Sequence, residues 1–352
     1  MLDSLLRSSF ILVVATAIPA CSSDPGGGGD GGGPGAVDAS GVPDAPAAVP
    51  GSFQLTWGPR LAVPAGRENI ECVMLRLGNE TPLKVNQIQN HLGPASHHFI
   101  IYKVPESAGM NEQPNPLPCQ SIDNLVNPNN GVPLMITQKF DETLMLPQGV
   151  AFELEANQLI RLEMHYINTS DEPLDIQATT TFIPIAESEF ENAADFLFAG
   201  NIDVDLPPGA STLGPSYIGV PAELQGVTFF GFTGHEHQWG TNVQVAMAAG
   251  ANGADTMVYD LPDFNWDEPE TVYLDPPVAL PEGGGFRLTC DWNNQSGGNV
   301  GFGESAGDEM CFFWSYYYPS RGARTCFHSD RINGGTDICC PGNALCGVLG
   351  NF

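Results

Sequence analysis

The sequence predicts an all-β protein built from antiparallel β-sandwiches. Gly and Pro are abundant, with 41 and 30 among 352 residues, while charged residues make up only 15%. Short segments alternate apolar and polar residues, and turn residues separate them. No long segment repeats with the period of an amphipathic helix, so many short strands joined by turns are the expected structure.

The strand pattern is clearest in four segments, residues 52–57, 98–104, 159–167 and 227–232. Turn signals such as LPPG at 206–209 and PEGGG at 281–285 lie between strand-like segments. With 42% hydrophobic residues, a chain of this length can bury two cores.

Composition also suggests where domains begin and end. A short acidic stretch at residues 186–195 separates two strand-rich halves of ordinary domain size. We therefore expect domains at 52–188 and 189–325, followed by a Cys-rich tail at 326–352.

The N-terminus carries export signals. An apolar run at residues 10–18 is too short to span a bilayer and is typical of a signal peptide covering residues 1–20. Ala20 directly before Cys21 resembles a bacterial lipobox, which implies cleavage before Cys21 and lipidation of its thiol. The alternative is an ordinary cleaved signal that leaves Cys21 free.

A Gly/Pro-rich linker at residues 21–51 would let the folded part stand away from a membrane. We expect an exported protein, lipid-anchored to the bacterial outer membrane or cell surface. The net charge of −29 excludes nucleic acid as a partner, because phosphate binding requires a basic surface. It also disfavours an anionic membrane surface, so the lipid would be the only membrane contact.

Eight cysteines remain when Cys21 is set aside. An even number in an exported chain predicts up to four disulfides, and zinc is the poorer interpretation because no CxxC pair exists. The eight are Cys72, Cys119, Cys290, Cys311, Cys326, Cys339, Cys340 and Cys346.

Histidines are the candidate metal ligands. His97 and His98 open an apolar strand, and on a regular strand neighbouring side chains point to opposite faces. Both can bind one metal only if the backbone twists or the rings use different nitrogens. His165 lies in an apolar strand, where a lone histidine is more often a core residue. His235 and His237 share one strand face, about 6–7 Å apart, and can converge on a metal.

Met310 would ordinarily be a core residue, but Cys311 follows it and Cys290 ends a strand. A Cys290–Cys311 disulfide would close a loop of about twenty residues and contribute roughly 3 kcal/mol on the chain-entropy model. It would also fix the direction in which Met310 points. His328, in the tail, is expected on the surface.

Five motifs follow one another in the chain: HHFIIY (97–102), EMHY (163–166), GHEHQWG (234–240), DFNW (263–266) and GESAGDEMC (303–311). In this order they resemble the copper type II, ascorbate-dependent monooxygenase family, which includes the peptidylglycine α-hydroxylating and dopamine β-monooxygenases. The resemblance runs from about residue 55 to about residue 320.

The resemblance implies two tandem, jelly-roll-like β-sandwich domains, each holding one copper across a solvent-filled cleft. Its electron-transfer copper would be held by His97, His98 and His165. Its oxygen-binding copper, which faces substrate, would be held by His235, His237 and Met310. Imidazoles alone suit zinc as well as copper, whereas a soft thioether favours Cu(I).

The implied activity is hydroxylation of a C–H bond in a small organic substrate, aromatic or peptide-like, with O₂ and a reductant such as ascorbate. A copper-handling surface lipoprotein without turnover is the alternative. A structural or adhesive β-sandwich lipoprotein is a third interpretation, against which the presence of all six ligand residues argues.

The chain departs from the family at several positions. Thr233, Phe312 and Trp314 stand where the peptide-hydroxylating enzyme has an arginine, an asparagine and a tyrosine that grip the substrate carboxylate. We therefore expect a more aromatic pocket and an apolar or aromatic substrate. Glu163 stands at the position of a family glutamine.

Further disulfides are expected. Cys72 and Cys119 flank the strand of His97 and His98 and should be paired. The four tail cysteines should form two bridges among themselves or links to the body of the protein, and which of these holds stays open.

Overall fold

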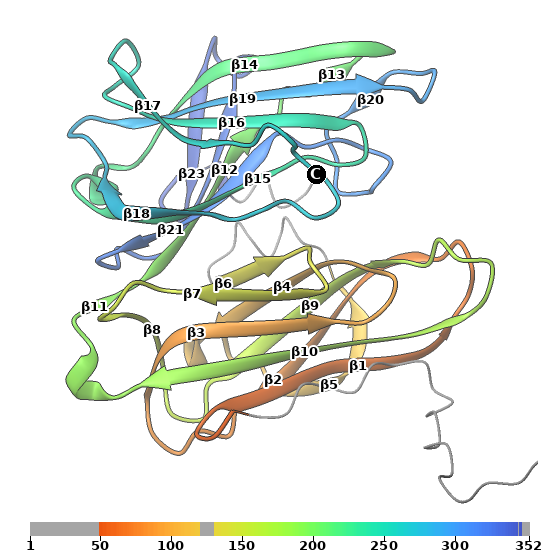
Figure 1. Ribbon diagram of the computed structural model, residues 1–352, viewed down its shortest axis with the longest axis vertical. Coiled ribbons are helices and arrows are strands. Elements are labelled where there is room, and N and C mark those ends of the chain that lie inside the picture. Colours follow the sequence, from red (N-terminus) through yellow and green to blue (C-terminus); the bar gives the residue numbers. More distant parts are fainter. Residues whose placement is uncertain (1–48, 120–129, 344, 347–352) are drawn as a thin grey trace, which may run out of the picture. The chain divides into compact units, whose positions relative to one another are not determined.

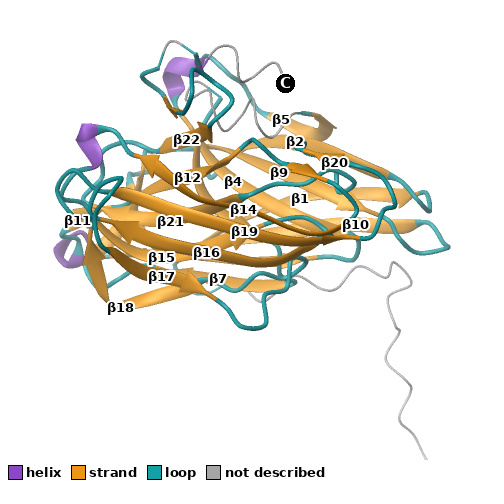
Figure 2. Ribbon diagram, turned by 90° about the horizontal axis from the view of Figure 1, so that it is seen from above, coloured by secondary structure: helices purple, strands orange, loops and turns teal. Residues whose placement is uncertain are grey.

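The structure, a computed structural model, describes residues 49–119, 130–343 and 345–346. Strands make up 58% and helix 3%, so the all-β prediction is confirmed (Figures 1 and 2). In the described segments that connect the strands, the helices are three single turns: η1 (Glu106–Ala108), η2 (Glu187–Glu189) and η3 (Ala222–Leu224). Among the described residues no helix has the length and apolarity to cross a membrane. The predicted signal peptide and Cys21 lie outside them.

Two sheets form the first half of the chain. One has the strand order β5-β2-β9-β4-β6 and the other β1-β10-β3-β8-β11, with β7 paired to β3. The strands of the first sheet are β2 (Glu68–Arg76), β4 (Ser96–Val104), β5 (Gln113–Pro118), β6 (Val132–Thr137) and β9 (Leu159–Ile167). Those of the second are β1 (Phe53–Val63), β3 (Leu83–Leu92), β7 (Asp141–Met145), β8 (Val150–Leu154), β10 (Leu174–Ile185) and β11 (Asn192–Ala193).

The second half contains a six-stranded sheet of order β18-β15-β21-β12-β22-β23, a four-stranded sheet of order β14-β19-β16-β17 and a short pair, β13-β20. The six strands are β12 (Asp195–Asn201), β15 (Thr228–His235), β18 (Val272–Ala279), β21 (Phe312–Tyr318), β22 (Arg324–Ser329) and β23 (Thr336–Cys340). The others are β13 (Asp205–Leu206), β14 (Gly209–Gly219), β16 (Gly240–Ala248), β17 (Asp255–Asp260), β19 (Gly285–Asn294) and β20 (Val300–Gly301). Figure 2 shows β14, β16 and β19 running side by side.

All four predicted strand segments coincide with strands, here β1, β4, β9 and β15, except that Ser52 and Val227 lie one residue before β1 and β15. The acidic stretch at 186–195 contains η2, β11 and the start of β12. Part of the predicted tail forms β22 and β23, which extend the six-stranded sheet. Because the described residues all belong to one compact unit, the domain boundaries stay predictions.

Strand β21 is buried on both faces. Phe312, Trp314 and Tyr316 belong to a core shared with the first half of the chain, whereas Phe313 and Tyr317 belong to the core of the second half. This alternation accounts for the almost continuous aromatic run FFWSYYY, because a strand covered on both sides is apolar at every position.

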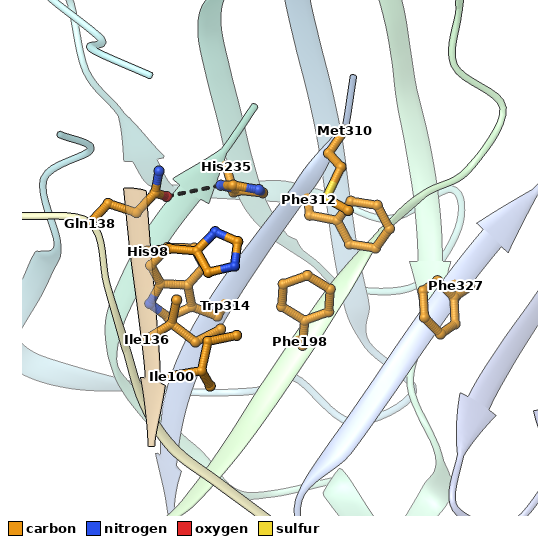
Figure 3. Close-up of a pocket in the computed structure, with 10 residues that line it drawn as sticks. All are labelled: His98, Ile100, Ile136, Gln138, Phe198, His235, Met310, Phe312, Trp314 and Phe327. Carbon is orange, nitrogen blue, oxygen red and sulfur yellow. Dashed lines mark hydrogen bonds between the residues drawn. The ribbon is translucent and has the colours of Figure 1, made fainter. Parts of the chain in front are cut away.

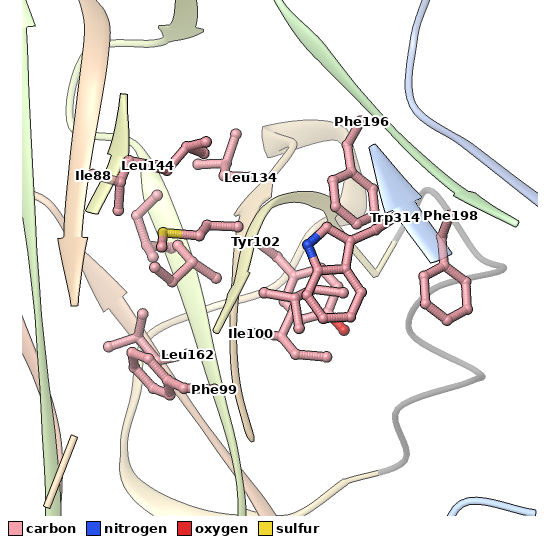
Figure 4. Close-up of a cluster of buried hydrophobic side chains, with 14 of the residues drawn as sticks. Ile88, Phe99, Ile100, Tyr102, Leu134, Leu144, Leu162, Phe196, Phe198 and Trp314 are labelled. Atoms are coloured by element: carbon pink, nitrogen blue, oxygen red, sulfur yellow. The ribbon is translucent and has the colours of Figure 1, made fainter. Parts of the chain in front are cut away.

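The first core therefore joins the two halves. Figure 4 shows Trp314 and Phe196 beside Ile100 and Tyr102 of β4, and all four belong to one buried cluster. Here the halves meet through apolar side chains, which differs from the solvent-filled cleft that the resemblance implies. The physical reason is the apolar face of β21 and β12, whose exposure to water would be unfavourable.

Candidate metal centre

A β-bulge brings His97 and His98 to the same place. On β4, Ser96 pairs with Tyr166 of β9, but His98 pairs with His165, so His97 is an extra residue in the ladder. A bulge of this kind bends the strand and redirects a side chain. It removes the strict alternation that would otherwise direct the two rings to opposite faces.

The rings of His97, His98 and His165 form a compact cluster. Their centroids are 5.3 Å apart for His97 and His98, 5.0 Å for His97 and His165, and 4.8 Å for His98 and His165. One ring nitrogen from each lies within 4.8 Å of the other two. All three residues are buried. Strands β4 and β9 thus place three imidazoles where one ion could contact them all.

Glu68 fixes the tautomer of His165. The Nε2–H of His165 donates to Glu68 Oε1 over 2.9 Å, and this hydrogen bond holds the pKa of Glu68 down to about 2. An ionised carboxylate only accepts, so the proton of a neutral His165 is on Nε2 and the lone pair is on Nδ1.

The nitrogens left over suit a metal ion. His165 Nδ1, His97 Nε2 and His98 Nε2 are buried and have no hydrogen-bond partner. Buried polar atoms without a partner are uncommon in folded proteins. A metal ion bound between the rings would satisfy all three atoms, so the donor set fits copper as the resemblance implies.

Burial keeps the imidazoles of four histidines neutral, those of His97, His98, His235 and His237. It lowers the pKa of His97 to about 3 and that of His98 well below its ordinary value, and neighbouring imidazoles act in the same direction. Burial likewise lowers the pKa of His237 to about 4 and that of His235 well below the ordinary value. Neutral imidazole is the form that binds a metal.

His235 and His237 form the second group. Their ring centroids are 5.1 Å apart at the end of β15. His235 Nδ1–H donates to Gln138 Oε1 over 2.9 Å, and His237 Nδ1–H donates to the carbonyl oxygen of Asp308 over 3.0 Å. Gln138 itself donates through Nε2 to the carbonyl oxygen of Trp266. On this assignment the lone pair of each ring is on Nε2.

Met310 is buried and lines the same cavity as His235 and His98. Figure 3 shows its side chain beside Phe312, facing the region of His235. The next residue is bonded to Cys290, which anchors the chain at Cys311 to β19. The structure thus brings the thioether of Met310, the imidazole of His235 and one ring of the first group, that of His98, around one cavity. His237 does not line this cavity, but its ring adjoins that of His235.

That cavity is small and apolar, with a volume of about 40 Å³. Of the described residues that line it, none has a lysine, arginine or carboxylate side chain: they are His98, Ile100, Ile136, Gln138, Phe198, His235, Met310, Phe312, Trp314 and Phe327. Gly200 of β12 leaves room for one of them, since a Cβ at Gly200 would stand 2.1 Å from Cδ1 of Phe312. Phe312 and Trp314, which stand at two of the three positions where the peptide-hydroxylating enzyme grips its substrate carboxylate, both line this cavity.

The two histidine groups adjoin each other. The ring centroids of His97 and His237 are 6.1 Å apart, and the Trp266 ring lies 5.9 Å from that of His97. Glu68 Oε1 also accepts the main-chain N–H of Ala306 over 3.1 Å, so one carboxylate contacts both halves.

Sequence reasoning missed three residues that orient the histidines and their loops: Glu68, Gln138 and Glu309. Glu309 stands inside a motif, next to Met310, and could have been noticed there. Glu68 and Gln138 lie far from the ligands in sequence, and no local pattern marks them. Glu163, at the position of the family glutamine, is fully buried.

Four disulfides occur among the described residues. Cys72–Cys119 and Cys290–Cys311 are the expected bridges, and the tail pairs as Cys326–Cys339 and Cys340–Cys346. The surface position expected for His328 is wrong, because the residue is only 8% exposed. Strands β12 and β23 flank its strand, and its Nδ1 contacts Asp337 Oδ1 at 2.7 Å.

Comparison with known proteins gives one family. A family model described as "Copper type II ascorbate-dependent monooxygenase, C-terminal domain" matches residues 216–334. This range contains His235, His237 and Met310, and it includes the strands β21 and β22. The first histidine group lies outside it. No curated protein matches the chain.

Solved structures similar to the chain include two of infectious bursal disease virus. The T13 viral particle gives 10% identity and a TM-score of 0.20, covering 78% of this chain and 72% of that one. The Gx strain gives 9% identity and a TM-score of 0.19, covering 76% and 69%. At TM-scores this low the likeness supports no conclusion about fold or function.

Proposed function

Through residues 216–334 the chain belongs to the copper type II ascorbate-dependent monooxygenase family, and on that premise we propose that it hydroxylates a C–H bond of a small organic substrate. One observation carries the proposal. Five buried histidines from both halves of the chain lie together. The hydrogen bonds of His165, His235 and His237 place the proton of each ring on one nitrogen and leave a lone pair on the other.

The proposed centre holds two coppers. His97, His98 and His165 would bind the copper that passes electrons, and His235, His237 and Met310 would bind the copper that meets oxygen and substrate. Copper supplies redox chemistry with O₂ that zinc does not have. Glu68, Gln138 and the Asp308 carbonyl hold the ring protons away from the metal positions, so the imidazoles need not lose a proton or turn before binding.

The substrate enters this proposal as an apolar group. A cavity of about 40 Å³ is far smaller than the cavity of about 150 Å³ that admits benzene, so it has room for a methyl or methylene group and not for a ring. The rest of a larger substrate would have to lie outside it. The aromatic wall and the lack of a cationic residue in it disfavour a substrate held by its carboxylate.

The domain organisation and location are part of the proposal. We take residues 52–188 and 189–325 as two jelly-roll-like β-sandwich domains of the family's kind, each providing one copper site. We also propose export and anchoring of the chain to a bacterial outer membrane or cell surface through lipid on Cys21. Substrate, O₂ and a reductant such as ascorbate would be the partners.

Oxygen consumption tests the function. Copper-loaded protein with ascorbate and a panel of small apolar and aromatic compounds should consume O₂ in step with formation of a hydroxylated product. His237→Ala should abolish product formation, whereas Glu282→Gln, at an exposed turn, should leave it unchanged. If copper binds in both groups but no compound raises O₂ consumption above that of free copper, the copper-handling alternative replaces the enzyme.

A further inference from the structure

Glu309 joins the two chain segments that carry the second histidine group and Met310. We propose that its carboxylate is a positioning residue that sets His237 and Met310 in their relative places around one copper, an inference that rests on the proposed function. The residue is not itself a ligand in this proposal, because both of its oxygens already accept hydrogen bonds.

Four N–H groups converge on this carboxylate. Oε2 accepts the main-chain N–H of His237 over 2.9 Å and that of Met310 over 3.3 Å. It also accepts Nε1–H of Trp292 over 3.0 Å, while Oε1 accepts the main-chain N–H of Trp239 over 2.7 Å. One oxygen therefore contacts the main chain of two proposed ligands of the same metal.

The carboxylate is fully buried. An ionisable group is costly to bury, and an apolar side chain of similar size often serves stability as well or better. The presence of a carboxylate here is explained by the geometry that it imposes and not by a gain in folding free energy. A carboxylate can accept several hydrogen bonds at once, and here three donors share Oε2 while one uses Oε1.

Other constraints in the region do not replace this link. The Cys290–Cys311 disulfide holds the chain after Met310 to β19, and the main-chain N–H of Asn293 in β19 donates to the carbonyl oxygen of Trp239 over 2.9 Å. Neither of these ties the main chain of the His237 loop to Met310. The hydrogen bond from His237 Nδ1 to the Asp308 carbonyl orients one ring. Glu309 is the side chain that ties the main chain of this loop both to Met310 and to Trp292 of β19.

Glu309→Gln is the direct test. The amide keeps the size of the side chain but has one acceptor oxygen, and its NH₂ group would face an N–H donor. We expect copper affinity at the second site to fall about 10- to 100-fold, as for other residues that orient metal ligands. In reduced, copper-saturated protein, the copper–sulfur contribution to the X-ray absorption should weaken. Copper affinity at the three-histidine site should be unchanged.

The matched control is Glu142→Gln. Glu142 accepts hydrogen bonds from Thr137 and Thr271, and burial raises its pKa, but it contacts neither ligand segment. This variant should keep both the second-site affinity and the copper–sulfur signal. The proposal is overturned if folded Glu309→Gln protein retains both properties at the wild-type level.

A second variant covers the case in which Glu309→Gln does not fold. Trp292→Phe removes only the donor that lies outside the ligand segments, and it should give a smaller but measurable fall in second-site affinity; an unchanged affinity would contradict the positioning role. The wild type separates the two ideas. If its reduced form lacks copper–sulfur scattering, the proposed function fails at Met310. If that signal is present and neither variant alters copper binding, only the role of Glu309 fails.

Discussion

The imidazole rings of His97 and His237 lie 6.1 Å apart between centroids, although one belongs to β4 and the other follows β15 in the opposite half of the chain. The two proposed copper sites thus adjoin at this pair of rings. Since His235 is also hydrogen-bonded by Gln138 of the first half, neither half alone provides the whole second group with its partners.

Copper stoichiometry is the first test of this arrangement. Protein loaded with copper and then desalted should retain two coppers per chain by metal analysis. His165→Ala should lower occupancy of the first site, because it removes one of three rings whose nitrogens lie together, and should leave about one copper bound. Retention of one copper or none by the wild type would contradict two sites.

Met310→His tests the soft ligand. An imidazole can still bind copper, so copper content should stay near two, but it favours Cu(I) less than a thioether does. We expect loss of the copper–sulfur signal and at least a tenfold fall in oxygen consumption, equivalent to about 1.4 kcal/mol in the barrier. Met247→Leu, a change at a buried methionine in the core of the second half, is the control and should keep both. Equal turnover by Met310→His and wild type would rule out the mechanism.

The disulfides should act on different copper sites. Replacing both Cys290 and Cys311 by Ala should lower the free energy of unfolding by about 3 kcal/mol on the chain-entropy model and weaken the second site. Replacing Cys72 and Cys119 should weaken the first site instead. The pair Cys326 and Cys339, which contacts neither histidine group, serves as the control: its loss should reduce stability in chemical denaturation without changing copper affinity.

His328 predicts a pH dependence of stability. Its hydrogen bond to Asp337 raises the pKa of His328 in the folded protein. The stabilisation is therefore fully present below the unfolded pKa of about 6.5 and is lost as pH rises through the folded pKa. The difference in unfolding free energy between wild type and His328→Gln should be largest in acid and shrink above neutrality. A difference that grew with pH would contradict the assignment.

The lipid anchor is tested by partitioning. Mature protein made in bacteria should enter the detergent phase, and Cys21→Ser should remain in the aqueous phase or keep its signal peptide. Cys119→Ser is unsuitable as a control because it breaks a disulfide, so Ser22→Ala, which should still partition into detergent, takes that place. If the wild-type protein stays in the aqueous phase, the lipid anchor is wrong and the N-terminus is an ordinary cleaved signal.

Much of the fold could be predicted from local patterns. Alternation marked the strand at 159–167 with the bounds that β9 has, because its apolar residues and its flanking turns are both local signals. In the run from Phe312 to Tyr318 the sequence does not predict which side chains point to which core, because a strand buried on both faces shows no alternation of apolar and polar residues. The partnership of β22 with β12, which buries His328, is a parallel contact between distant segments that no local pattern encodes.

The candidate site divides in the same way. His235 and His237 share a face by simple counting along a strand, and Met310 was located by its motif. Glu68 and Gln138 escaped prediction because their contacts with His165 and His235 depend on long-range packing. The sequence does not predict whether His97 and His98 converge, because neighbouring residues of a regular strand point to opposite faces and only an irregularity brings both rings to one side.

The bulge at His97 acts as a change of phase in the strand. Before it, Ser96 is in register with Tyr166, and after it His98 is in register with His165, so two residues of β4 are spent on one step of β9. The alternation of side chains between the two faces of the sheet is therefore shifted by one residue at the start of the segment Phe99 to Val104. Deletion of His97 would keep both pairs in register and restore a regular ladder, but it would leave β4 with one histidine instead of two. Chain length between fixed pairs, and not only side-chain identity, is therefore part of what makes a metal site from two adjacent histidines.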